Sequence, residues 1–365
     1  YLFAQGGSEG ATDKGNKITL KNIFNVSPPN DPTGNEKTIG MYLDTAVKGK
    51  STYVDNTVDM SNGNAKVSVT KKAIGIYAKN ADNSKNNIIN TLKVLSDGQG
   101  TVGVFTDGDL KLSGATGLIE AKNSGIGLYG NSGKVTVDGK HKVEVTSAGT
   151  GMYMTNGSYL EGGELELKNN TAGTAAAGIY YTKGNNSNEV THNTDLKVNS
   201  GNNLLALYAD GGIDLKNAKT VTVDAGKDNV GAFVTNASKF TNDGTINVGS
   251  SSSSMTNGLG VYVEDGEAVN NSGKNINVTD VTAGSSSVGM AAVAAAGKTA
   301  KVTNDGTITA VGDAMAMNVA DNSEGVNTGT IVANEVALSP TNILKAIGAY
   351  VNGNNAKFTN TGTVK

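Results

Sequence analysis

The residue types that most often carry out acid–base, nucleophilic or metal chemistry are scarce in this chain. Histidine occurs only twice, at His141 and His192, and both cysteine and arginine are absent. Without cysteine the chain has no thiolate ligand, thiol nucleophile or disulfide. Two histidines with different predicted neighbours do not supply a metal site or a catalytic triad. We therefore expect both to be exposed loop residues.

Carboxylates gather in two short clusters, Glu161-Glu164-Glu166 and Glu264-Asp265-Glu267. Paired carboxylates cleave glycosidic bonds in many enzymes, and β-helical polysaccharide-active enzymes assist them with Arg, Lys or a metal. Here arginine is absent, and no histidine or aromatic side chain surrounds either cluster, so solvated turns explain them better. The sequence thus predicts a protein that is not an enzyme and holds no cofactor and no metal. A polysaccharide-active β-helix enzyme is the alternative.

The motifs for phosphate and calcium are incomplete. Gly49-Lys50-Ser51 and Gly297-Lys298-Thr299 lack the glycine that a phosphate-binding loop needs five residues earlier. The register that begins at Asp109 places Lys111 where calcium requires an oxygen ligand. A net charge of −3 without arginine gives no basic face, so we expect no nucleic-acid partner. No apolar run reaches the ~18 residues of a membrane span.

One five-residue pattern recurs along the chain: aliphatic, glycine, aliphatic, aromatic, and a small or apolar residue. Its aromatic position returns every 24 to 35 residues, and ten of the 18 aromatic residues occupy it. The copies begin at Ile39, Ile74, Val102, Ile126, Thr150, Ala177, Leu205, Val230, Leu259, Val288, Ala314 and Ile347. The copies at Val288 and Ala314 are degenerate. An internal repeat of this length is typical of solenoids.

Between the copies lie short segments in which apolar and polar residues alternate, such as Lys66-Val67-Ser68-Val69 and Val221-Thr222-Val223. In the second half a turn introduces them, as in Thr241-Asn242-Asp243-Gly244-Thr245-Ile246. Asparagine and glycine supply the left-handed conformations that tight corners require. Short strands with such corners and no helical period indicate an all-β protein.

A period near 28 residues is too short for a propeller blade of ~40–45 residues, and no hexapeptide period of a left-handed β-helix is found. Parallel crossover connections are generally right-handed. We therefore predict an all-β fold, a right-handed parallel β-helix of about twelve coils. No linker divides the chain, so residues 1–365 are predicted to form a single continuous β-helix segment.

Strand alternation predicts which side chains face the interior of the coils. We expect Ile74, Ile76 and Ala78 to point inward, and Gly75 and Tyr77 to point outward. The stacked outward rings are expected to stabilise neighbouring coils by about 0.5–1.5 kcal/mol per pair; the alternative is a carbohydrate-binding or partner-binding stripe. The corresponding interior row is predicted to contain Ile76, Leu128, Ile179, Leu207 and Val261.

Four irregular excursions are predicted, near residues 21–38, 44–57, 79–90 and 182–193. If the chain binds a partner, contacts are expected from loops, because the regular coils hold one another together. The first excursion carries three prolines, which reduce the entropy lost on ordering. The candidate partner-binding residues in the first two excursions are Phe24, Asn30, Asp31 and Tyr53. The alternative is that both loops only cap or decorate the first coils.

The alternation of Gly-x-Tyr strands, as in Gly75-Ile76-Tyr77 and Gly260-Val261-Tyr262, with Asn-x-Gly-Thr-Ile turns, as in Asn242–Ile246 and Asn304–Ile308, resembles the passenger repeats of the large type V autotransporters of Fusobacterium. The arginine-free, lysine- and asparagine-rich composition agrees with this resemblance, which extends from Ile39 onward.

The resemblance implies a passenger-domain fragment of an arginine-inhibited or galactose-sensitive type of adhesin, displayed on the outer side of the bacterial outer membrane. The implied function is attachment to host cells or other bacteria. The implied partners are a host-cell glycan or receptor protein, or the surface of another bacterium. We expect a monomer with no membrane span in this fragment. An inert stalk without ligand binding is a further alternative.

Overall fold

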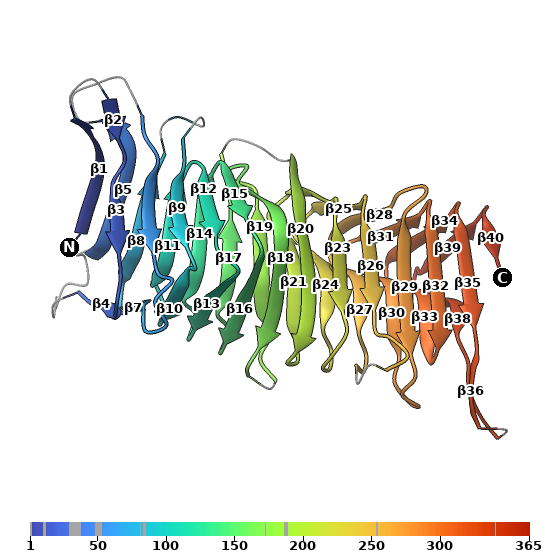
Figure 1. Cartoon of the computed structure of the whole chain (residues 1–365). Coiled ribbons are helices and arrows are strands. Elements are labelled where there is room, and N and C mark those ends of the chain that lie inside the picture. Colours follow the sequence, from blue (N-terminus) through green and yellow to red (C-terminus); the bar gives the residue numbers. More distant parts are fainter. Residues whose placement is uncertain are drawn as a thin grey trace. The chain divides into compact units, whose positions relative to one another are not determined.

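The computed structural model describes residues 2–9, 12–28, 38–47, 53–80, 82, 85–171, 173–185, 189–252, 255–339 and 341–365. Within these ranges the regular secondary structure is entirely β-strand, and no helix is present. Strands of successive coils pair in parallel to form a β-solenoid of about ten turns (Figure 1). The predicted fold class is thus confirmed, with a coil number close to the expected twelve. The right-handed sense and the single continuous domain stay predictions.

The chain forms two compact units. Unit 1 comprises Tyr1–Glu166, Ala176–Tyr180 and Gly184–Ser187. Unit 2 comprises Leu167–Ala175, Tyr181–Lys183 and Asn188–Lys365. Each unit is built from three rows of parallel strands, because each coil contributes one strand to each row.

In unit 1 the first row holds the repeat motif. It consists of β1 (Leu2–Glu9), β5 (Thr38–Val47), β8 (Ala73–Lys79), β11 (Val102–Asp107), β14 (Ile126–Ser132), β17 (Thr150–Met154) and the first residues of β19 (Ala176–Thr182). The short strand β2 (Thr12–Lys14) pairs antiparallel with β1. The second row consists of β3 (Lys17–Thr19), β6 (Asn56–Asp59), β9 (Asn87–Asn90), β12 (Leu110–Ser113), β15 (Lys134–Val137) and the first residues of β18 (Tyr159–Asn169). The third consists of β4 (Ile23–Val26), β7 (Lys66–Thr70), β10 (Lys93–Asp97), β13 (Thr116–Lys122) and β16 (Lys140–Thr146).

Unit 2 repeats this plan. Its motif row consists of β21 (Leu204–Asp210), β24 (Val230–Val234), β27 (Leu259–Val263), β30 (Ser287–Ala292), β33 (Ala314–Val319) and β38 (Ile347–Val351). The long strand β20 (Glu189–Ser200) starts both other rows. One continues through β22 (Asp214–Asn217), β25 (Ser238–Asn242), β28 (Gly266–Asn270), β31 (Ala300–Asn304), β34 (Ser323–Asn327) and β39 (Lys357–Asn360). The other continues through β23 (Thr220–Val223), β26 (Thr245–Val248), β29 (Asn275–Asp280), β32 (Thr307–Gly312), β35 (Thr330–Asn334) and β40 (Thr363–Val364).

The core of each unit is a narrow column of aliphatic side chains. All twelve predicted motif copies lie in strands, and the five residues predicted for the interior row are completely buried. That prediction is confirmed. Apolar burial of this kind contributes roughly 25 cal/mol per Å² removed from water, so the column is the main source of stability.

The prediction that the motif glycine faces outward is wrong. A Cβ atom added to Gly75 would lie 2.7 Å from Cγ2 of Val69 and 2.8 Å from Cγ1 of Val67, and both valines are core residues. Ile74, predicted to be interior, is only half-buried. Gly75 and Ile76 therefore both face inward, which breaks the strict alternation. Strand β7, which carries Val67 and Val69, lies so close to Gly75 that a side chain at this position would clash with the two valines.

This close approach gives a testable prediction at Gly127. A Cβ atom there would lie 2.3 Å from Cγ2 of Ile119 and 2.6 Å from the carbonyl oxygen of Gly151. We expect Gly127→Ala to lower the free energy of unfolding by about 1–3 kcal/mol, because overpacking a filled core forces neighbours to shift. Urea unfolding followed by circular dichroism measures the loss.

Two control variants separate the causes of that loss. At Gly63 an added Cβ meets no atom within 4 Å, so Gly63→Ala should be close to neutral. At Gly231 the carbonyl contact is the same, 2.6 Å, but the nearest side-chain atom is Cγ2 of Ile246 at 3.5 Å. Ala206 already occupies the equivalent position of another coil, so Gly231→Ala should cost less than Gly127→Ala. Equal losses at all three positions would contradict the steric explanation.

A second buried feature runs along unit 2 as a ladder of asparagine side chains. Each amide nitrogen donates a hydrogen bond to Oδ1 of the asparagine one coil further, over distances of 2.7 to 3.0 Å. The ladder consists of Asn217, Asn242, Asn270, Asn304, Asn327 and Asn360. Asn242 and Asn304 belong to the turns identified in the sequence, and Asn327 and Asn360 begin turns of the same Asn-x-Gly-Thr pattern. They stand at the last position of their strands, where they also hydrogen-bond the backbone of the following corner.

The excursions are shorter than predicted, because the flanking strands extend into them. Residues 23–26 of the first excursion form β4, and β5 continues to Val47 inside the second. Strand β9 occupies residues 87–90, and β20 begins at Glu189. Residues 29–37 and 48–52 lie outside the described residues.

Candidate functional site

Of the four predicted partner-binding residues, Phe24 and Tyr53 lie within the described residues. Phe24 lies in β4, where it pairs with Val67, rather than in an irregular loop. Its ring packs against Gly40 of the motif row and is half-buried. Phe24 thus lies in a strand and not in the irregular excursion predicted for it, and its role in binding a partner stays a prediction. Tyr53 is half-buried and forms an isolated antiparallel bridge with Ala46. Asn30 and Asp31 lie outside the described residues.

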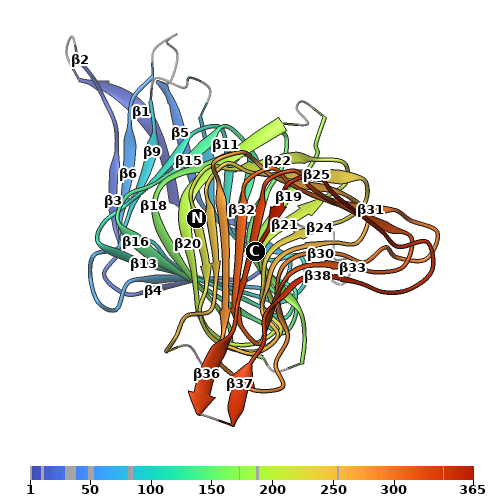
Figure 2. The same ribbon diagram turned by 90° about the vertical axis from the view of Figure 1, so that its right-hand side faces the viewer.

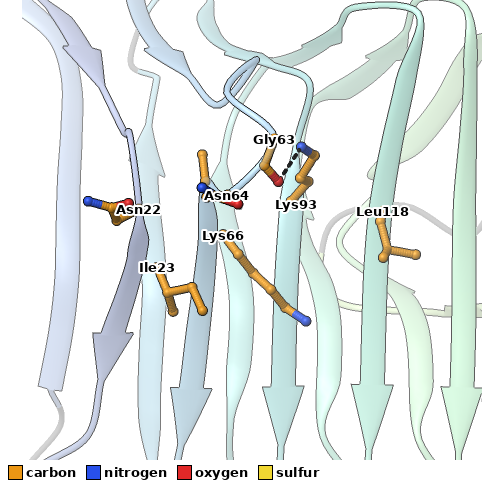
Figure 3. A pocket seen from close by; sticks show the side chains of 8 residues that line it. Asn22, Ile23, Gly63, Asn64, Lys66, Lys93 and Leu118 are labelled. Carbon is orange, nitrogen blue, oxygen red and sulfur yellow. Dashed lines mark hydrogen bonds between the residues drawn. The ribbon is translucent and has the colours of Figure 1, made fainter.

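An open groove of about 770 Å³ lies beside β4 on the outer surface of unit 1 (Figure 3). Ile23 is 58% exposed there. The ammonium group of Lys93 donates to the carbonyl oxygens of Asn62 and Gly63, at 3.1 and 3.4 Å, and Lys66 forms an ion pair with Glu120. Glu120 neutralises Lys66, whereas Lys93 keeps its positive charge, because backbone carbonyl oxygens carry none. It is lined by Asn22, Ile23, Gly63, Asn64, Ala65, Lys66, Lys93 and Leu118.

Both histidines are buried, so the prediction of exposed loop residues is wrong. His192 lies inside unit 2, with Nε2 at 2.7 Å from the carbonyl oxygen of Thr194 and Nδ1 at 3.0 Å from the hydroxyl of Tyr181. A carbonyl only accepts, so Nε2 carries the proton and Nδ1 accepts from Tyr181. Burial lowers the pKa of His192 to about 4. His141, inside unit 1, has a pKa lowered by the same cause. Each imidazole is thus a neutral core group.

The signal for His192 was present in the sequence. Val190, Leu196 and Val198 are apolar residues at even positions of one strand, and all three face the core. The same alternation places His192 on the inner face.

The first carboxylate cluster lies on strand β18 instead of a turn, which corrects the prediction. Glu161 pairs with Lys134 at 3.1 Å, and Glu164 pairs with Lys140 at 2.9 Å. In the second cluster, Asp265 pairs with Lys298 at 2.9 Å and Glu267 lies 3.9 Å from Lys239. Within the described residues, no group of three or more His, Cys, Asp or Glu side chains could hold a metal ion.

Charged side chains form a row of alternating sign on the outer face of unit 2. The residues occupy one register position in consecutive coils, so each stands next to a residue of opposite sign. In the tighter ion pair of this row, Nζ of Lys301 lies 3.4 Å from Oε2 of Glu324. A hollow of about 590 Å³ lies over this row. Because positive and negative side chains are equal in number, the row gives the hollow no net charge. The row consists of Asp214, Lys239, Glu267, Lys301, Glu324 and Lys357.

The aromatic stripe of unit 1 is a continuous stack. Successive ring centroids are 4.9 to 5.3 Å apart, and the ring planes differ by 8 to 22°. Ring faces between two neighbours are covered, so only edges meet solvent, whereas stacking on a sugar needs an open face. This favours the structural interpretation of the stripe. The stack consists of Phe3, Tyr42, Tyr77, Phe105, Tyr129, Tyr153 and Tyr180.

A feature missed in the sequence is the hairpin of β36 (Val336–Ser339) and β37 (Asn342–Leu344). It projects from the coils of unit 2 at the lower edge of both views (Figures 1 and 2). Leu344 is buried near Gly312, whereas Leu338 and Ile343 are 48% and 46% exposed. Two short apolar segments around Ser339-Pro340-Thr341 were the available signal.

The geometry defines a parallel β-helix repeat protein whose coil surfaces are largely occupied by internal ladders. No protein-family model, curated protein or solved structure matches the chain. In the described part of the chain, no helix is suited to crossing a membrane.

Proposed function

We propose that this chain is a segment of a bacterial surface adhesin, displayed on the extracellular side of the outer membrane. In this proposal the coils hold a contact element that attaches the cell to a host or to another bacterium. The observation that carries the proposal is the β36–β37 hairpin, which projects from the coils and exposes Leu338 and Ile343.

The surfaces of the regular coils have less to offer a partner. The ring stack of unit 1 covers its own faces, and the charge row of unit 2 neutralises itself. Insertions carried by a rigid scaffold are common places for binding residues. The hairpin is such an insertion, and Leu344 anchors it to the coil below.

The chemistry of the hairpin favours a protein over a glycan among the proposed partners. Leu338 and Ile343 are aliphatic, and their burial against a partner would remove apolar surface from water. A glycan is bound chiefly through hydrogen bonds and open aromatic faces. The contact element therefore suits a receptor protein of the host or a protein on another bacterium.

The test is a binding measurement with the double variant Leu338→Ser/Ile343→Ser. We expect the variant to bind target cells at least about tenfold more weakly, because the two anchors together contribute about 1.4 kcal/mol or more. Flow cytometry with labelled protein on host and bacterial cells measures this. Circular dichroism and thermal unfolding verify that the coils persist.

Ile23→Ser is the matched control, because Ile23 is also an exposed aliphatic residue, and it tests the groove of unit 1. A larger loss of cell binding with Ile23→Ser than with the double variant would indicate that the partner binds at that groove. Replacing residues 29–37 or 48–52 by a short Gly-Asn turn tests the excursions predicted at 21–38 and 44–57. Failure of the unaltered chain to bind any cell would favour the inert stalk, and release of sugars from polysaccharides would favour the enzyme.

A further inference from the structure

The ring stack of unit 1 contains three pairs of adjacent tyrosines from different coils. Tyr42 and Tyr77 have ring centroids 5.2 Å apart and planes that differ by 9°. Tyr129 and Tyr153 are 4.9 Å apart at 22°, and Tyr153 and Tyr180 are 4.9 Å apart at 9°. All five rings are half-buried. Phenol groups of separate coils are thus held side by side with part of each ring open to solvent.

We propose that these three pairs are sites of oxidative cross-linking, at which a haem peroxidase with hydrogen peroxide joins neighbouring coils through dityrosine. Each phenol loses one electron and one proton to give a phenoxyl radical. The two radicals form a carbon–carbon bond between ring positions ortho to the hydroxyls, and the ortho hydrogens then return to the oxygens. The two electrons and two protons removed reduce one hydrogen peroxide to two water molecules.

The backbone ladder supplies the positioning that this coupling needs. Tyr42 pairs in register with Tyr77, and Tyr129 with Tyr153. Groups held in this way react as an intramolecular pair, which greatly raises their effective concentration over that of two separate chains. Because the rings start nearly parallel, they must twist about their side-chain bonds to form the new bond, and their exposed edges leave space for that movement.

The surroundings also suit a one-electron oxidation. Burial raises the pKa of Tyr42, Tyr77 and Tyr129, so the phenols are neutral at physiological pH and must release their protons as they are oxidised. The negative charges of Asp44 and Asp107 act on Tyr42 and Tyr77 in the same direction as burial and also raise the pKa of both phenols.

Such links would join coils that are far apart in sequence. A bond between Tyr42 and Tyr77, or between Tyr129 and Tyr153, closes a loop that the unfolded chain would otherwise leave open. A covalent closure of this kind restricts the unfolded state, as a disulfide does. This chain has no cysteine, so tyrosine coupling would give the solenoid a covalent reinforcement that disulfides cannot supply.

The experiment treats the full chain, at low concentration, with a haem peroxidase and hydrogen peroxide. Dityrosine fluorescence and mass spectrometry of the digested protein locate the cross-links. We expect links within one chain between Tyr42 and Tyr77 and from Tyr153 to Tyr129 or Tyr180, together with a raised midpoint of thermal unfolding. The same oxidation in urea should lose this selectivity.

Two variants change the number of tyrosines in the stack while keeping an aromatic ring at each position. Tyr153→Phe should abolish both links of that residue and leave the Tyr42–Tyr77 link unchanged. Phe105→Tyr should add links to Tyr77 and Tyr129, since Phe105 stacks on both at 5.0 Å. Three results would each overturn the proposal. The first is cross-links only between separate chains, and the second is cross-links at whichever tyrosines are most exposed, without regard to stacking. The third is the absence of a new cross-link in the Phe105→Tyr variant.

Discussion

Replacing Asn304 with alanine is expected to destabilise unit 2 by about 2–4 kcal/mol, because the buried amides of Asn270 and Asn327 each lose one of their two ladder partners. Asn304 accepts from the amide nitrogen of Asn270 at 2.8 Å and donates to Oδ1 of Asn327 at 2.8 Å. It also hydrogen-bonds the carbonyl oxygens of Gly306 and Thr330. Equilibrium unfolding in urea measures the change in free energy.

Asn277→Ala is the matched control. Asn277 also donates to an asparagine one coil away, Asn247, at 2.9 Å, but this pair is only partly buried. Water can replace the lost bond there, so the expected cost is about 1 kcal/mol or less. Similar costs at Asn304 and Asn277 would show that burial does not strengthen the ladder.

The second large effect is a loss of stability in acid that depends on His192. As the pH falls below about 6.5, the unfolded chain protonates this imidazole, whereas the folded chain does so only near pH 4. The unfolded state thus binds more protons in this window. We expect the contribution of His192, about 3 kcal/mol and complete above pH 6.5, to be lost as the pH falls to about 4.

His192→Gln removes the titrating group and isolates its contribution. Its free energy of unfolding should fall less steeply than that of the unaltered chain between pH 6.5 and 4, whatever its stability at neutral pH. Chemical denaturation at a series of pH values gives both slopes. Carboxylates and His141 contribute equally to both proteins, so identical slopes would mean that His192 is already accessible to protons in the folded state.

Much of the fold could be predicted because one repeat sets both the backbone and the core. The motif places an aliphatic residue such as Ile76 at the same point of every coil, and the strand period then determines what is buried. The inward orientation of Gly75 could not be predicted in this way. Its orientation depends on the close approach of Val67 and Val69 from the third row of strands, which is a contact between distant segments.

The candidate site was less predictable, for physical reasons that differ from residue to residue. Phe24 was expected in a loop because prolines follow it, yet pairing with β7 draws it into a strand. His192 was judged by its residue type, although the alternation of its neighbours placed it inside. The β36–β37 hairpin is an insertion between two copies of the repeat, so the periodic pattern carries no information about Leu338 and Ile343.

The charge row of unit 2 has a consequence for how the coils find their neighbours. Lys239, Glu267 and Lys301 follow one another at one register position. A coil that paired with its next-but-one neighbour would place Lys239 beside Lys301, and like charges directly opposite each other on adjacent strands are destabilising. The interior offers no such discrimination, because one aliphatic residue resembles another. The surface row therefore disfavours an assembly that omits a single coil, because such an assembly places like charges side by side. The aliphatic core then stabilises the coils that have paired in the correct order.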